Sequence, residues 1–282
     1  MLRASIPSPA KSFLEIGPLT VHFYALCIIA GIAVAIWLGD KRLRAINPQL
    51  VSVVADVAIV AVPAGILGGR LYHVISSPRD FFGSTGSPAD IFAIWKGGLG
   101  IWGAISVGAL AAAWAYRRQV RLKSELDFPP FARFLDVLAP GILLAQAIGR
   151  FGNWFNIELF GRPLDTWWGL EIPSRYRPSG FVEFATFHPT FLYEAIWCTL
   201  VAAALLIFGK KLASGQSFAL YIALYCLGRF FIENLRIDTA NQILGLRQNQ
   251  WVSFIIGAVA IVIFMRLRRV VGLSGDSGTL RT

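Results

Sequence analysis

Long apolar runs alternate with short polar segments along this chain, and within each run the apolar residues are continuous. A helix that crosses a bilayer needs about 20 predominantly apolar residues. The strands of a membrane barrel would instead show alternating segments of about ten residues. Seven continuous runs occur, at approximately 20–39, 52–75, 98–116, 134–152, 189–209, 216–235 and 249–267. The pattern predicts an all-α polytopic membrane protein with about seven transmembrane helices.

Composition supports the class of membrane protein, and the distribution of charge predicts the orientation of the helices in the membrane. The 282 residues are 56% hydrophobic and 15% charged, with a mean hydropathy of +0.61, whereas soluble domains carry about 25% charged residues. The net charge of +10 does not indicate nucleic-acid binding, because most of the surplus lies at helix ends. Basic clusters follow the odd-numbered spans, at 41–44, 117–123, 210–211 and 266–269. The positive-inside rule then predicts an outside N-terminus and a cytoplasmic C-terminus.

Two long loops, at about 76–97 and 153–188, fall on the predicted outer side. The second loop holds Trp154, Trp167 and Trp168 together with several turn-forming prolines. We interpret it as a small external subdomain inserted into a transmembrane domain that covers residues 1–271. The Gly- and Ser-rich tail at 272–282 is predicted to be a disordered cytoplasmic segment.

Several chemistries find no support in the sequence. Cys27, Cys198 and Cys226 lie inside apolar runs, which favours small buried side chains over disulfides. No H-E-x-x-H or C-x-x-C pattern occurs, so no metal site and no cofactor are predicted. No G-x-S-x-G sequence occurs either, which leaves an intramembrane hydrolase without an evident nucleophile.

The segment at 149–161, GRFGNWFNIELFG, places an arginine, two asparagines and a glutamate at one membrane boundary. Hydrocarbon penalises such groups by several kcal/mol, so they are expected where a site or a buried network uses them. Arg150 and Asn153 share a helix face, and a guanidinium there can bind a phosphate through two hydrogen bonds. The alternative is an arginine that snorkels to the interface, but snorkelling requires none of Asn153, Asn156 and Glu158.

The sixth span ends in a second polar stripe. Tyr225, Arg229, Glu233 and Arg236 recur at spacings of four, four and three residues. Glu233 can pair with either arginine, which would leave one guanidinium for an anionic headgroup. The alternative is an Arg–Glu network that satisfies itself and stabilises the bundle.

Other polar residues stand near span ends. Arg70 and Tyr72 close the second span, and Tyr24 opens the first. His188 precedes Pro189 at the start of the fifth span, where capping or interfacial placement is the ordinary role. His188 becomes a candidate base if it faces the site.

The pattern G-R-x-G-N-x-x-N-x-E-x-x-G at 149–161 resembles the family motif of the bacterial prolipoprotein diacylglyceryl transferases. His-Pro-x-x-Leu-Tyr-Glu at 188–194 and Arg-Phe-x-x-Glu-x-x-Arg at 229–236 extend the resemblance, which covers nearly the whole chain. It implies a seven-helix, multi-pass enzyme of the bacterial plasma membrane. Such enzymes move a diacylglyceryl group from phosphatidylglycerol to the lipobox cysteine of a prolipoprotein signal peptide, and glycerol phosphate is released.

The resemblance carries over to individual positions. Arg150 and Arg229 look like the essential arginines, so they are our first catalytic candidates, with Tyr225 and His188 added. The candidates for phosphatidylglycerol binding are Arg150, Asn153, Glu158, Gly161, Arg229, Glu233, Arg236, Tyr24, Arg70 and Tyr72. Trp102 stands where well-known members have a histidine, so that histidine is not available here as the base. A transporter or flippase for an anionic lipid is the alternative function, because it would use the same arginines without breaking bonds.

Overall fold

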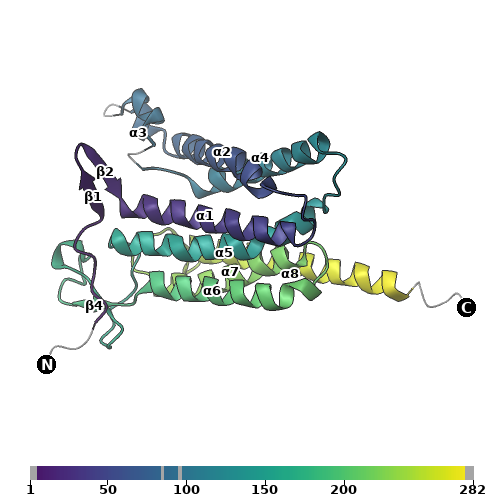
Figure 1. Cartoon of the computed structure of the whole chain (residues 1–282). Helices are drawn as coiled ribbons and strands as arrows, with labels where there is room; N and C mark the ends of the chain where they lie inside the picture. Colours follow the sequence, from purple (N-terminus) through teal and green to yellow (C-terminus); the bar gives the residue numbers. More distant parts are fainter. Residues whose placement is uncertain (1–4, 84–85, 95–96, 277–282) are drawn as a thin grey trace, which may run out of the picture. The chain divides into compact units, whose positions relative to one another are not determined.

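The structure is a computed structural model that describes residues 5–83, 86–94 and 97–276 and is mostly helical (Figure 1). The long helices are α1 (Phe23–Arg44), α2 (Val53–Ser76), α4 (Ile101–Leu122), α5 (Phe131–Phe155), α6 (Thr190–Phe208), α7 (Gln216–Leu235) and α8 (Gln248–Asp276). Short helical segments are α3 (Arg79–Phe82), η1 (Pro88–Phe92), η3 (Ser174–Tyr176) and η4 (Gly209–Lys211). The strands are β1 (Phe13–Ile16), β2 (Leu19–His22), β3 (Leu170–Glu171), β4 (Thr186–Phe187), β5 (Gln242–Ile243) and β6 (Leu246–Arg247).

The chain forms two compact units, Gly39–Phe131 and the remainder. In the larger unit, α5, α6 and α7 share a core built around Leu143, Cys198 and Tyr221. The α1 backbone approaches α5 closely at Gly31, where an added Cβ would lie 3.0 Å from Ala145 O. The five long helices of this unit run alongside one another, with the β1–β2 hairpin at one end and the C-terminal end of α8 at the other (Figure 1).

The smaller unit is built on the pairing of α2 with α4. Small residues meet along this contact, and a Cβ added at Gly68 would lie 2.6 Å from Gly103 O. Close approach of this kind lets helix backbones pack tightly in a membrane. The loop between the two helices is fixed by Arg70, whose Nε donates to Ile91 O at 2.9 Å and whose Nη1 donates to Gly97 O at 2.6 Å.

Residues 153–188 contribute most of a small hydrophobic core, and their role as a separate subdomain stays a prediction. The core is formed by Ile157, Phe160, Leu170, Ile172, Phe187 and Phe191. A segment near the N-terminus completes it, because Ile6 N–H donates to Gly169 O at 2.9 Å and Ile6 O accepts from Glu171 N–H at 2.8 Å. This N-terminal contribution was not predicted. We refer to residues 153–188 together with residues 5–8 as the head.

Two β-hairpins were also missed by the apolar pattern, because each is only a few residues long. The β1–β2 hairpin turns at Gly17, whose φ is 61° at the first central position, and proline follows; this suits a type II′ turn. The β5–β6 hairpin turns at Leu244 and Gly245, both with positive φ, as a type I′ turn requires.

Helices form at all seven predicted runs, and the prediction of an all-α polytopic membrane protein is confirmed. Six helices of the described residues are long and apolar enough to cross a membrane: α1, α2, α5, α6 (with η4), α7 and α8. The helix at the third run, α4, carries Arg117, Arg118 and Arg121 in its second half, and its crossing stays a prediction. Helix α8 continues to Asp276, so the start of the predicted disordered tail is helical, and residues 277–282 lie outside the described part.

Candidate active site

The end of α5 is shaped by a cap that bends the polar motif back onto its own helix. Ile157 has a φ of 55°, in the left-handed region where glycine is usual. Its N–H donates to Trp154 O at 3.1 Å, and Glu158 N–H donates to Asn153 O at 3.1 Å. These are the two bonds of a Schellman motif. The bend brings Glu158 Oε1 to 2.8 Å from Asn153 Nδ2.

Arg150 lies less than one turn before Asn153 and points into the bundle. Its Nη1 donates to Asn153 Oδ1 at 3.4 Å, which confirms that the two residues share a face. Its Nη2 donates to the Tyr225 hydroxyl at 3.3 Å and forms an ion pair with Glu194. One guanidinium therefore joins α5 to both α6 and α7.

Glu194 is the anion at the centre of this arrangement. Its side chain is 4% exposed, and its Oε2 lies 3.0 Å from Arg229 Nη1. The Tyr225 hydroxyl donates to Glu194 Oε1 at 3.2 Å. A buried carboxylate is stable only when paired and hydrogen-bonded, and Glu194 meets both conditions through Arg150, Arg229 and Tyr225.

A second buried carboxylate, Glu233, gathers three arginines. Its Oε2 lies 2.6 Å from Arg229 Nη2 and 3.5 Å from Arg236 Nη1. Its Oε1 lies 2.8 Å from Arg247 Nε and accepts a hydrogen bond from Asn249 Nδ2 at 3.2 Å. The expectation that Glu233 would leave one guanidinium of the stripe free is wrong, because its Oε2 lies within ion-pair distance of both Arg229 and Arg236.

Asp238 extends the network beyond the end of α7. Its Oδ1 lies 2.7 Å from Arg236 Nε, and its Oδ2 lies 2.9 Å from Arg247 Nη2. Partial burial alone would raise the pKa of Asp238. The hydrogen bonds and positive charges of the two arginines outweigh burial and hold that pKa below its ordinary value.

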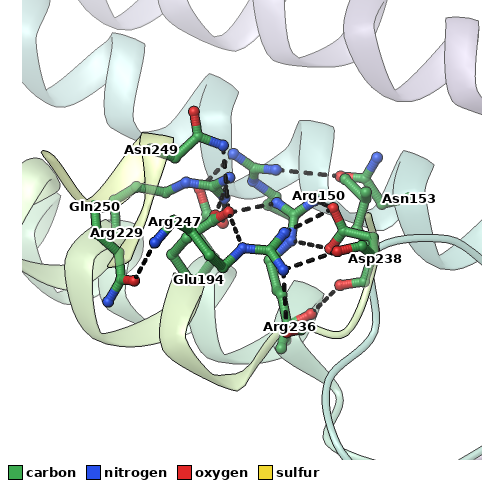
Figure 2. A network of polar contacts seen from close by, with 12 residues as sticks. Arg150, Asn153, Glu194, Arg229, Arg236, Asp238, Arg247, Asn249 and Gln250 are labelled. Atoms are coloured by element: carbon green, nitrogen blue, oxygen red, sulfur yellow. Dashed lines mark hydrogen bonds and ion pairs between the residues drawn. The ribbon is translucent and has the colours of Figure 1, made fainter. Parts of the chain in front are cut away.

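Figure 2 shows these side chains converging from different elements on one polar cluster. We call this set the Arg–Glu cluster; its charged members are Arg150, Arg229, Arg236, Arg247, Glu194, Glu233, Asp238 and, through Asn153, Glu158. Four cations face four anions, so the cluster balances its own charge. An anionic ligand at these guanidinium groups would compete with the carboxylates that already pair with them.

A small cavity of about 10 Å³ lies within the Arg–Glu cluster, which is room for roughly one water molecule. It is lined by Arg150, Asn153, Leu159, Thr190, Phe191, Glu194, Arg229, Ile232 and Arg236. A larger ligand would fit here only if side chains that line the cavity moved.

Gly161 and His188 hold the end of the 149–161 segment against the start of α6 and the end of α7. Gly161 N–H donates to His188 O at 2.9 Å, and a Cβ on Gly161 would lie 2.8 Å from His188 Cβ and 3.0 Å from Leu235 O. The His188 ring bonds through Nδ1 to the Tyr193 hydroxyl at 3.1 Å. Among the residues that the structure describes, its side-chain hydrogen bonds reach no member of the Arg–Glu cluster. Burial and the charge of Arg162 hold the pKa of His188 below its ordinary value.

The other residues singled out from the sequence are not members of the Arg–Glu cluster as defined above. Tyr24 packs its ring on α5, where a Cβ at Gly152 would lie 2.6 Å from Tyr24 Cδ2. Arg70 is buried and its guanidinium is occupied by backbone carbonyls of the following loop. Tyr72 is 42% exposed on α2, and Trp102 stands at the start of α4. The last three belong to the smaller unit.

Three cluster residues were missed as site candidates: Glu194, Asp238 and Arg247. Glu194 closes the His-Pro-x-x-Leu-Tyr-Glu motif, and a carboxylate inside an apolar run was itself a signal that it could be buried and paired. Asp238 follows Arg236 by two residues, in a loop. Nothing in the sequence reveals that a two-strand hairpin places Arg247 against Glu233.

Fold and site together define a multi-pass helical membrane protein with a buried Arg–Glu cluster at one end of its helix bundle. The family model for prolipoprotein diacylglyceryl transferase matches residues 11–266, so the chain belongs to the prolipoprotein diacylglyceryl transferase family. It is 50% identical over 264 residues to phosphatidylglycerol–prolipoprotein diacylglyceryl transferase 2 of Streptomyces coelicolor, covering 92% of this chain and 80% of that protein.

Two further relatives carry the name phosphatidylglycerol–prolipoprotein diacylglyceryl transferase. The protein of Cutibacterium acnes is 48% identical over 274 residues, covering 96% of this chain and 89% of the relative. The protein of Paenarthrobacter aurescens is 49% identical over 276 residues, covering 93% and 83%. The predicted family is confirmed, and with it a transferase of a bacterial membrane that acts in the first step of lipoprotein maturation.

Proposed function

We propose that this chain transfers the diacylglyceryl group of phosphatidylglycerol to the lipobox cysteine of prolipoproteins, and that the Arg–Glu cluster is where the transfer occurs. The names of its relatives support both substrates. The observation that carries the location is that Arg150 and Arg229, from different helices, are held on one buried carboxylate beside a small cavity.

The reaction breaks one bond and makes one. The cysteine sulfur attacks the glyceryl C3 carbon, the bond from that carbon to the phosphate oxygen breaks, and its electron pair leaves with glycerol phosphate. The thiol proton goes to a base. Because a free cysteine has a pKa of about 8.5, nearby guanidinium groups favour its thiolate form and also stabilise the charge that builds up on the departing phosphate.

We assign separate roles to the members of the cluster. Arg150 and Arg229 bind the phosphate after exchanging Glu194 for it, and Tyr225 and Asn153 keep the Arg150 guanidinium oriented. Glu158 acts through Asn153. A guanidinium offers paired N–H groups that match a phosphate, so the exchange conserves the number of ionic contacts.

The proton acceptor is His188 or a water molecule. The lowered pKa of His188 keeps its imidazole neutral near pH 7, and a neutral ring can accept a proton. In the tautomer in which Nδ1–H donates to the Tyr193 hydroxyl, Nε2 carries no proton and can accept one.

The membrane orientation also belongs to this proposal. Basic clusters at the C-terminal ends of α1, α4 and α6 and in the second half of α8 support an outside N-terminus, an outside head and a cytoplasmic C-terminus. The cluster then lies at the outer leaflet, where the cysteine of a translocated substrate emerges.

Mass spectrometry of a lipobox peptide incubated with the purified protein and phosphatidylglycerol tests the function. The expected product is the peptide with one diacylglyceryl group in thioether linkage, formed together with glycerol phosphate. An unmodified peptide, with protein that is folded and binds the lipid, would instead support lipid transport and reduce Arg150 and Arg229 to binding residues.

A further inference from the structure

The outer edge of β1 offers unpaired backbone groups. Phe23 N–H donates to Ser12 O at 3.0 Å, and β1 pairs with β2 in the register Phe13↔His22 to Ile16↔Leu19. Hydrogen-bonded and non-bonded pairs alternate in an antiparallel ladder. The N–H and C=O groups of Phe13 and Glu15 therefore point away from β2. Within residues 5–83, 86–94 and 97–276, no other strand pairs with this edge.

A cavity of about 510 Å³ flanks that edge. Its first wall is formed by every residue from Pro9 to Glu15, and no residue of β2 contributes. Its second wall is formed by Phe155, Asn156, Ile157, Arg175 and Tyr176. The volume lies within the range of ligand-binding clefts, and we call this cavity the β1 groove.

The β1 groove connects to the Arg–Glu cluster through a chain of hydrogen bonds. Asn156, in the groove wall, donates from Nδ2 to Glu158 Oε1 at 3.4 Å. The same oxygen accepts from Asn153 at 2.8 Å, and Asn153 accepts from Arg150 at 3.4 Å. A molecule in the groove therefore lies beside the motif that carries the first catalytic arginine.

We propose that the β1 groove binds the prolipoprotein stretch that follows the lipobox cysteine, as an extended strand added to the edge of β1. The inference rests on the proposed function, which brings a polypeptide to this end of the helices. The signal segment before the cysteine lies in the bilayer, where a helix satisfies its own backbone. The stretch after the cysteine leaves the bilayer without such partners, and a free strand edge supplies them largely independently of side-chain sequence.

Glu15→Pro isolates the backbone contact. Proline removes the outward N–H of Glu15, and an edge strand tolerates it there because that N–H makes no bond to β2. Glu15→Ala is the matched control, since it removes the side chain and keeps the N–H. Each full-length variant is assayed with phosphatidylglycerol and two lipobox peptides. One peptide ends directly after the cysteine, and the other continues for about six residues, the usual length of a strand.

The expected result is a loss of kcat/KM of roughly tenfold for Glu15→Pro with the long peptide. The short peptide should be processed as by the wild type, which also shows that the variant is folded. Glu15→Ala keeps the N–H, so its loss with the long peptide should be much smaller than that of Glu15→Pro. A loss of equal size with both peptides, or a raised KM for phosphatidylglycerol, would overturn strand addition; the second result would assign the groove to lipid.

The result with the wild-type protein distinguishes failure of this inference from failure of the proposed function. If the wild type modifies both peptides and Glu15→Pro shows no selective loss, only the strand addition is wrong. If it modifies neither peptide, the proposed function fails, and the inference fails with it.

Discussion

Glu194 Oε2 accepts a hydrogen bond from Arg229 Nη1 at 3.0 Å, while the other oxygen of Glu194 pairs with Arg150. One buried carboxylate of α6 thus bridges arginines of α5 and α7. A buried ion pair adds little net stability compared with apolar packing, but removing one partner leaves a charge uncompensated and costs about 3–5 kcal/mol. Loss of either partner would therefore destabilise the site, and under the proposed function the bridge competes with the lipid phosphate for the same arginines.

Replacing the Glu194 carboxylate by an amide should separate its effect on stability from its competition with phosphate. Glu194→Gln keeps the size of the side chain but leaves two guanidinium groups without their shared anion. We expect a loss of about 3 kcal/mol in the free energy of unfolding, measured in detergent by thermal or denaturant unfolding. The KM for phosphatidylglycerol should fall severalfold, because the intramolecular competitor is gone. Glu183→Gln, at an exposed position of the head, is the control and should change neither quantity. A raised KM with unchanged stability would refute the competitor role.

The sequence was sufficient for the helices and for the contacts made along one helix. Arg150 with Asn153 and Arg229 with Glu233 are three and four residues apart, and both pairs meet in the structure. The pairing of Arg150 with Glu194 was not predictable, because it depends on how α5 and α6 are rotated against each other. Apolar periodicity does not determine that rotation when helices are apolar on most sides.

The β1–β2 hairpin was missed for a different reason. Its strands have four residues each, and they join directly to the apolar run of α1, so the run absorbed part of the second strand. Without the hairpin, the strand edge at Glu15 and the β1 groove could not have been inferred from the sequence.

Arg247 should matter although it lies outside the helical motifs. It contacts Glu233 Oε1 and Asp238 Oδ2, and its Nη1 also donates to Asp238 O at 2.8 Å. Lysine presents one compact charge rather than a planar fork, so Arg247→Lys can satisfy only part of this set. We expect kcat/KM to fall about tenfold, corresponding to roughly 1.4 kcal/mol, because the Glu233 carboxylate that pairs with Arg229 loses its fixed position. Arg121→Lys, on the exposed end of α4, is the matched control. Wild-type turnover of Arg247→Lys would show that the hairpin contact has no part in catalysis.

Gly161 and Gly149 lie in the same motif but differ in the space around them. A Cβ at Gly161 would meet His188 Cβ at 2.8 Å and Leu235 O at 3.0 Å, whereas at Gly149 the nearest atom is Ile28 Cδ1 at 3.6 Å. We expect Gly161→Ala to lower stability by about 1–3 kcal/mol through overpacking, and to lower turnover because α7 shifts with Leu235. Gly149→Ala should retain both. Unfolding curves of the two variants in one detergent compare them directly, and equal stabilities would contradict the close contact.

His188 should make stability depend on pH near neutrality. Burial and then the charge of Arg162 hold its pKa in the folded protein below the ordinary value of 6.5. Between these two pKa values the unfolded chain binds more protons than the folded protein, so stability falls as pH drops through 6.5 towards the folded pKa. We expect the midpoint of thermal unfolding to decrease from pH 7.5 to pH 5.5 in the wild type. His188→Gln should lose this part of the decrease, and Arg162→Gln should reduce it, because one of the two causes is gone. A slope unchanged by His188→Gln would show that other groups titrate there.

The same variant, His188→Gln, tests whether His188 is the proton acceptor in the proposed reaction. Turnover at pH 7.5 within a few-fold of wild type assigns the thiol proton to water. A loss of about 100-fold or more, the scale of general-base catalysis, assigns it to His188.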